Sequence, residues 1–274
     1  VGELQITSTA PKILFIDSDT DPDYELRNMN GVFRLRDSTN DIIRITQTGS
    51  ITNVAGHIDV GAGIDVTGAI TGTTDATING LTVGRGTNDV ATNTALGTRA
   101  INDSSVSGGN NTGIGYQALQ DLTSGTVNTG VGFNALNSNT TGHSNVGVGY
   151  NAGFGNATGA HNVAVGTHAL DTIANTSQNV AVGSNSLTNN TASNNTAVGY
   201  ASLLSNTSGT QNTVVGSLAL QTNSTSSGNS ALGYSALKVN TGAQNSGFGS
   251  FALGANTSGT QNTGIGYQAA RQST

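Results

Sequence analysis

An asparagine followed four residues later by a glycine recurs through the last two thirds of this 274-residue chain. The asparagines that open these units are Asn93, Asn111, Asn128, Asn145, Asn162, Asn179, Asn195, Asn212, Asn229, Asn245 and Asn262. Successive units begin 16 to 18 residues apart, and most begin 17 apart. A chain that repeats one short unit this regularly folds as a solenoid, in which each coil packs against its two neighbours.

Side chains alternate within each unit. In the stretch NTGIG, which starts at Asn111, Thr112 and Ile114 alternate with glycines. Alternation with period two indicates a β-strand. Clusters of Gly, Ser, Thr and Asn, such as those at 123–128 and 140–145, have the composition of turns. We therefore predict that each coil contains two short strands and two turns.

Two columns of equivalent residues predict how the coils pack. From the second unit on, the third residue is Gly or Ala except at Val214, which predicts a thin, flattened roll whose interior is filled by these small residues. The fourth residue is apolar and is then expected to point outward: Ile114, Val131, Val148, Val165, Val182, Val198, Val215, Leu232, Phe248 and Ile265. Because ten stacked apolar side chains would form a long exposed stripe, we expect identical chains to cover it, as in a homo-oligomer.

The asparagine column has a structural interpretation. Equivalent residues of stacked coils lie about 4.8 Å apart. Side-chain amides at that spacing can form a continuous hydrogen-bonded ladder. We expect this ladder at Asn111, Asn128, Asn145, Asn162, Asn179, Asn195, Asn212, Asn229, Asn245 and Asn262.

Charge is sparse and unevenly distributed. Charged residues make up 9% of the chain, against about 25% in typical soluble domains. Thirteen of the fifteen carboxylates precede residue 104, which places a boundary between two kinds of structure near residues 85–105. The net charge of −6 without a basic cluster argues against a nucleic-acid partner. The chain has no cysteine, so its fold uses no disulfide.

The sequence before the repeats predicts two further parts. Residues 1–52 are predicted to form an N-terminal β-meander or small sandwich, with strands at 12–17, 23–29, 31–37 and 41–49. Residues 53–92 hold short Val and Ile runs interrupted by glycine, too thin for a core of their own, and fit a stalk in which three chains wind around one another. The repeat domain is then 93–274.

Two stretches resemble known families. The repeat NTGIGYQAL resembles the head repeat of trimeric autotransporter adhesins, although adhesin units are commonly shorter than 17 residues, and the same repeat of bacteriophage tail fibres. The stretch APKILFIDSDTDPDYELRNMNGVFRLRDSTNDIIRIT, followed by GHIDVGAGIDVTGAITG, resembles modules of tail fibres from marine and cyanobacterial phages. The resemblance implies an all-β, homotrimeric fibre whose last part is a left-handed parallel β-roll of about eleven coils.

The function implied by this resemblance is structural and adhesive. As a virion tail fibre outside the cell, the trimer would contact other tail proteins and attach to a host cell-surface glycan or outer-membrane component. The alternative is a bacterial trimeric surface adhesin or extracellular filament subunit, which could use the same repeat. An ice-binding solenoid would need regular threonine ladders. The varying length of the coils argues against such ladders here.

No catalytic, metal or cofactor site is predicted, and we do not expect an enzyme. Cleavage of a glycosidic bond needs two carboxylates about 5–10 Å apart. Within the later repeats Asp121 and Asp171 are three coils apart, about 14 Å along the axis. The stretch DSDTDPD at 17–23 lacks the glycine and glutamate that an EF-hand calcium loop needs, so we interpret it as an acidic turn.

Two groups of ring side chains remain open to two interpretations. His143 and His161 lie at neighbouring places in adjacent coils, where a trimer could gather them around a metal or anion, or where they are ordinary turn residues. The tyrosines Tyr116, Tyr150, Tyr200, Tyr234 and Tyr267 recur at one coil position. They could form a carbohydrate-binding strip or pack at a subunit seam.

Overall fold

The computed structural model describes residues 12–15, 24–29, 32–37, 76–78, 81–172 and 175–272. The chain divides into two units, Val1–Ala69 and Ile70–Thr274. In the described residues the regular structure is β throughout, apart from one short 3-10 turn, η1 (Thr87–Asp89). None of the helical structure in those residues is long and apolar enough to cross a membrane.

The first unit contains an antiparallel three-stranded meander of β1 (Lys12–Phe15), β2 (Tyr24–Met29) and β3 (Val32–Asp37). Its central strand β2 pairs with both neighbours. These strands fall within three of the four ranges that the sequence predicts. The fourth, 41–49, lies outside the described residues.

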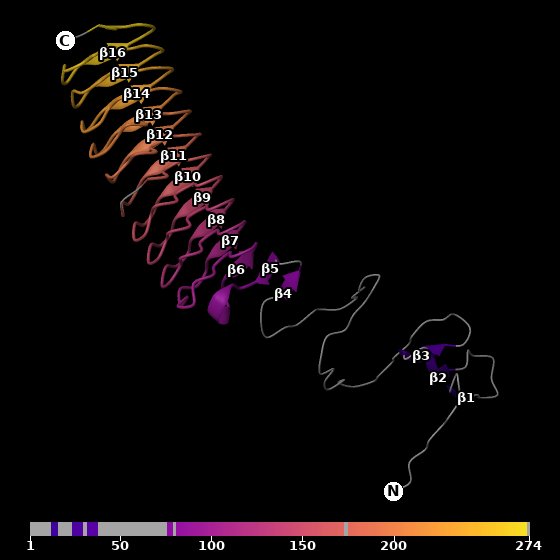
Figure 1. The fold of residues 1–274 in the computed structure, drawn as a ribbon. Helices are drawn as coiled ribbons and strands as arrows, with labels where there is room; N and C mark the ends of the chain where they lie inside the picture. The colour runs from indigo at the N-terminus through magenta and orange to yellow at the C-terminus, as the bar shows by residue number, and fades with distance from the viewer. Residues whose placement is uncertain are drawn as a thin grey trace. The chain divides into compact units, whose positions relative to one another are not determined.

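The second unit is a β-solenoid built on one thirteen-stranded sheet. Its strands are β4 (Ala76–Ile78), β5 (Leu81–Gly84), β6 (Thr94–Leu96), β7 (Thr112–Ile114), β8 (Thr129–Val131), β9 (Val146–Val148), β10 (Val163–Val165), β11 (Val180–Val182), β12 (Thr196–Val198), β13 (Thr213–Val215), β14 (Ser230–Leu232), β15 (Ser246–Phe248) and β16 (Thr263–Ile265). From β6 to β16 each strand pairs in parallel with the strand of the next coil, always between equivalent residues. The chain thus forms about ten coils of about 17 residues, stacked in chain order (Figure 1).

The N-terminal end of the stack is closed by an antiparallel hairpin. Strands β4 and β5 pair with each other, and β5 pairs with the first coil strand, β6. The buried side chains of Ile101 and Val106 belong to an apolar cluster in the interior of the first coils, and the partly buried Val90 packs against it. The sheet therefore starts at Ala76, inside the range that the sequence assigns to the stalk.

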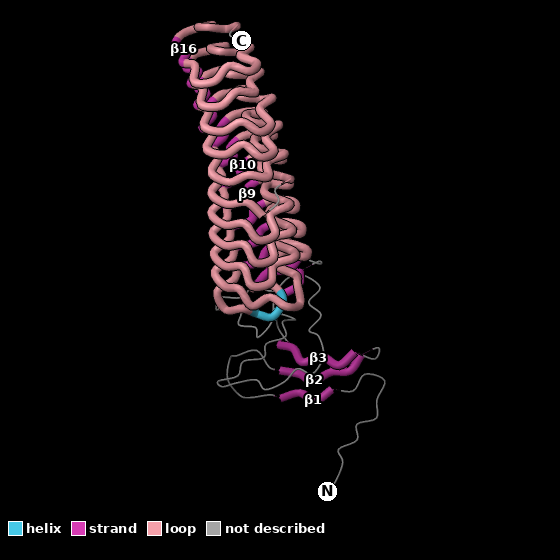
Figure 2. The backbone as a smooth tube through the Cα atoms, turned by 90° about the vertical axis from the view of Figure 1, so that its left-hand side faces the viewer, coloured by secondary structure: helices cyan, strands magenta, loops and turns pink. Residues whose placement is uncertain are grey.

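Each coil contains one strand, which corrects the prediction of two (Figure 2). We number coil positions from the opening asparagine, so that the strand occupies positions 2 to 4. Positions 7 and 9 have left-handed backbone angles, with φ of 57° at Gln117 and 53° at Leu119. The N–H of Gln117 donates to the coil before, at Thr98 O (3.0 Å), and the N–H of Leu119 to the coil after, at Ala135 O (3.0 Å). The backbone thus stays hydrogen-bonded between coils without forming a second strand.

Leucine, and not only Gly and Ala, fills the interior. Position 9 is fully or almost fully buried in eight coils, by Leu119, Leu136, Leu170, Leu187, Leu203, Leu220, Leu237 and Leu253. A leucine held at left-handed φ costs about 1–2 kcal/mol, and burying its side chain offsets that cost by about 1.5–3 kcal/mol. A Cβ added at Gly147 would lie 2.8 Å from Leu136 Cγ of the preceding coil. Position 3 is small because the leucine of the coil before lies against it.

Position 5 is glycine in every coil for two structural reasons. Its φ lies between 117° and 142° in every coil, a region that L-residues rarely adopt. A Cβ added at Gly132 would also lie 2.4 Å from the carbonyl oxygen of Gly149 in the next coil. The spacing of the coils therefore leaves room for hydrogen alone at this position.

The asparagines of position 1 form a continuous hydrogen-bonded ladder inside the roll. The backbone N–H of Asn128 donates to Asn111 Oδ1 (2.9 Å), and its side-chain amide donates to Asn111 Oδ1 (3.1 Å) and to Gly142 O (2.8 Å). The backbone bond to the preceding Oδ1 recurs at every step from Asn93 to Asn262. These buried amides satisfy backbone groups that the turns would leave without partners.

A second column of buried asparagines lies at position 12. It consists of Asn139, Asn156, Asn190, Asn206, Asn223, Asn240 and Asn256. Asn206 donates to Asn190 Oδ1 (2.7 Å) and to Gly209 O (2.9 Å) within its own turn. This column was not predicted from the sequence, although an asparagine three residues before a turn Gly and six before the next position 1 recurs in NTTGHSN, NATGAHN and NTSGTQN.

Candidate oligomer interface and corner ladder

The ten predicted interface residues lie at position 4, on the outward face of the sheet. In this single chain all ten are half-buried or exposed, whereas position 3 between the two outward positions is buried in every strand. Exposure reaches 51% at Leu232 and 72% at Ile265 in the last coil. The coils above and below cover only part of these side chains, so a substantial apolar surface of position 4 remains exposed in the single chain.

The outward face carries no charge, and its position 4 is apolar in every strand from β6 to β16. Position 2 holds Thr, Val or Ser, and no charged side chain occurs at positions 2 or 4 from β6 to β16. In β9, β10 and β11 both outward positions are valine, which makes a patch of six valines in three successive coils. We call position 4 of β6–β16 the apolar stripe.

A second column of large side chains lies just past the glycine of position 5, where the chain turns out of the strand. We call it the corner ladder: Tyr116, Phe133, Tyr150, His168, Tyr200, Leu218, Tyr234, Phe251 and Tyr267. The Tyr116 and Phe133 rings stack with centroids 5.0 Å apart, and those of Phe133 and Tyr150 5.3 Å apart. Because these rings cover one another's faces, they expose mainly edges to solvent. The stacked part therefore offers a carbohydrate few of the open ring faces that a binding strip would need.

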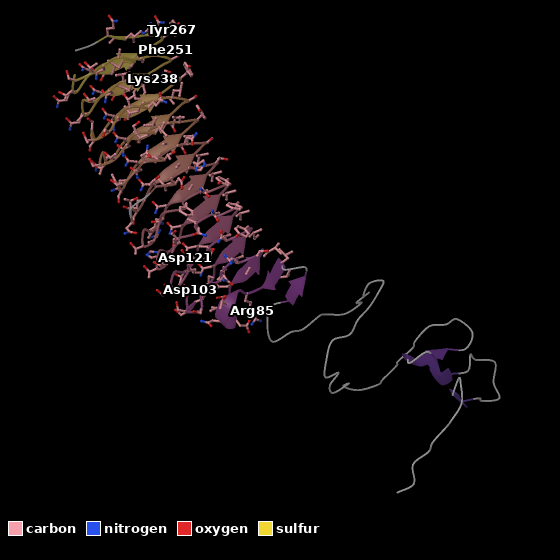
Figure 3. All side chains as sticks on the ribbon, viewed as in Figure 1. Arg85, Asp103, Asp121, Lys238, Phe251 and Tyr267 are labelled. Atoms are coloured by element: carbon pink, nitrogen blue, oxygen red, sulfur yellow. The ribbon has the colours of Figure 1, made fainter. Side chains whose placement is uncertain are left out.

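In some coils the large side chain of the corner ladder stands at position 6, and in others at position 7. Tyr and Phe at position 6 are followed by Gln, Asn, Ala or Ser, whereas Ser217 and Ser250 are followed by Leu218 and Phe251. Where the column changes, rings meet edge to face: Tyr234 and Phe251 at 5.3 Å and 81°. The Arg271 guanidinium lies 5.5 Å from the Phe251 ring centroid. Figure 3 marks Phe251 and Tyr267 in neighbouring coils at the C-terminal end of the stack.

The sequence predicted only the tyrosines of this ladder. Its remaining members do not recur as one residue type at one position: Phe133 differs in type, and His168, Leu218 and Phe251 also stand one residue further along. The complementary pattern, in which a small residue at position 6 precedes a large one at position 7, is nevertheless readable in the printed sequence. The exception is the coil that starts at Asn179, where both positions are small: Ser184 and Asn185.

Two carboxylates of neighbouring coils, Asp103 and Asp121, influence each other electrostatically. Asp121 belongs to the coil after Asp103 (Figure 3), and its pKa is raised, first by burial and then by the charge of Asp103. Hydrogen bonds from the hydroxyl and backbone N–H of Ser105 lower the pKa of Asp103. The charge of Asp103 thus opposes ionisation of Asp121, whereas Asp171 lies 2.6 Å from His168 Nδ1.

The two turn histidines do approach each other. The exposed His143 and His161 rings meet edge to face, with centroids 5.1 Å apart. No group of three or more potential metal-ligating side chains occurs among the residues that the structure describes. The acidic stretch at 17–23 lies outside them.

Comparisons with protein families, with curated proteins and with solved structures found no match for this chain.

Proposed function

We propose that this chain forms the shaft of a homotrimeric extracellular fibre that attaches to a host cell surface. The observation that carries the proposal is the apolar stripe, which runs through every coil strand without a charge and remains partly exposed in the single chain. A neutral apolar surface of this length is costly in water unless it is covered. A closed arrangement of identical chains covers the same stripe on each of them.

Adhesion is the role that such a rod serves best. A trimer would present three copies of each surface feature at fixed separations, so weak contacts to a glycan or envelope protein would add through avidity. The setting in a phage tail fibre, with other tail proteins as neighbours, is supported by the resemblance of the N-terminal modules. The left-handed winding and the N-terminal module with its stalk belong to the same proposal.

The test is the molar mass of the purified 1–274 chain in native buffer, measured by light scattering. We expect three times the single-chain mass of 27.4 kDa. Val165→Asp places a charge in the middle of the apolar stripe and is expected to give monomers that keep the β-type circular dichroism of the solenoid. The matched control Thr167→Asp, exposed and two residues away outside the stripe, should remain trimeric. A wild-type monomer would overturn the proposal.

A further inference from the structure

The corner ladder has one break. In the coil that starts at Asn179, Ser184 and Asn185 stand where every other coil from Tyr116 to Tyr267 contributes a large side chain. Tyr200, in the next coil, is 56% exposed, more than the other tyrosines of the ladder except Tyr267 in the last coil. On the side of the break, the Tyr200 ring has only small polar side chains as ladder neighbours.

The break has the height of one ring. His168 and Tyr200 flank it from coils two steps apart, which corresponds to about 10 Å along the axis. A ring inserted midway would lie about 5 Å from each. That distance matches the 5.0 and 5.3 Å between the stacked rings at the other end of the ladder.

Polar groups border this gap. The Ser184 hydroxyl and the Asn185 side-chain amide form no hydrogen bond within the described residues. In the coil before, His168 Nδ1 lies 2.6 Å from Asp171 Oδ2, and the second carboxylate oxygen of Asp171 forms no hydrogen bond within the described residues. An aromatic face combined with a few convergent polar groups is the composition of a small-ligand site.

We propose that this gap, lined by His168, Asp171, Ser184, Asn185 and Tyr200, is a notch that binds one pyranose ring of a carbohydrate. The C–H face of the sugar packs on the electron-rich face of Tyr200. The amide, hydroxyl and carboxylate pair with sugar hydroxyls, which a planar apolar ring lacks. The inference rests on the proposed adhesive function and gives it a location on the shaft.

The test uses saturation-transfer NMR on the full 1–274 chain. The probes are the methyl pyranosides of glucose, galactose, mannose and N-acetylglucosamine. We expect transfer to the ring C–H protons of at least one probe and a shift of the Tyr200 ring signals. Tyr200→Ala should abolish the transfer, and Asn185→Ala should weaken it at least threefold.

Two further variants separate binding from folding. Ser184→Tyr supplies the missing ring, so it should abolish the transfer while leaving the thermal midpoint unchanged or higher. Tyr116→Ala removes a ring at the start of the ladder and should leave the transfer intact. Transfer from the wild-type chain to none of the four probes, or transfer that survives Tyr200→Ala, would overturn the notch.

The oligomer mass distinguishes this inference from the proposed function. A trimer that binds none of the probes overturns the notch and leaves the fibre shaft standing. A monomer that binds a probe through Tyr200 keeps the notch and overturns the shaft. If Ser184→Tyr breaks the trimer, a second copy fills the gap, and the notch is not a carbohydrate site.

Discussion

Positions 3 and 4 are neighbours in every strand, yet they obey different constraints. Position 3 points inward and, from the second unit on, is Gly or Ala in nine of ten strands, with Val214 as the exception. Position 4 points outward and ranges from valine to phenylalanine. The inward residue must fit the volume left by its own chain, because the leucine of the coil before lies against it. The outward residue needs only to be apolar.

This difference separates folding from assembly within one strand. Substitutions on the inward side change contacts between coils of the same chain, so they should change the stability of the solenoid itself. Substitutions on the outward side leave these contacts in place, so they should change the contacts between chains. Val165→Asp changes the outward side alone.

The largest effect is expected from Gly132→Ala. The new methyl would lie 2.4 Å from Gly149 O while the residue keeps φ at 135°, so both strain and clash oppose the folded state. We expect a loss above about 4 kcal/mol, seen as lost amide protection across β8 and β9 in hydrogen exchange.

The control is Gly266→Ala in the last coil. This glycine shares the positive φ, at 117°, but a Cβ there meets no atom within 4 Å. Its loss should be limited to backbone strain of about 1–3 kcal/mol. Equal effects of the two substitutions would show that coil contact does not set this position.

Leu220→Ala should have the next largest effect. The Leu220 side chain is fully buried, and truncating it leaves a cavity between coils. We expect a loss of about 2–5 kcal/mol in urea unfolding. Leu218→Ala in the same coil, half-buried in the corner ladder, is the matched control and should lose less than half as much.

The smallest effect is expected from Asp121→Asn. Because burial and Asp103 raise the pKa of Asp121 above its unfolded value, the ionised form disfavours folding, and this penalty appears as the pH rises through the folded pKa. The variant should be more stable than wild type at pH 7, by about 0.5 kcal/mol or less for this surface group. Thermal midpoints across pH should show the difference disappearing below the unfolded pKa. A difference that persists there would point to packing instead of charge.

The period of the sequence predicted the solenoid, the strand that follows each opening asparagine, and the inward and outward positions. It could not predict the second half of the coil. Leucine carries no signal for left-handed φ, so nothing in the sequence distinguished the left-handed positions such as Leu119 from a second strand. The corner ladder was predicted only in part, since its members share volume and not identity. The break at Ser184 and Asn185 became visible once the neighbouring rings could be placed in adjacent coils.

The equivalent pairing of every coil with the next has a consequence for how such a chain changes in evolution. From β6 to β16, every repeat forms the same backbone pairing with the repeat that precedes it. Duplicating or deleting one repeat in the gene therefore changes the length of the stack by one step of about 4.8 Å without requiring a compensating substitution elsewhere. The reach of the molecule is set by the number of encoded repeats, and it can change independently of the chemistry on its surface.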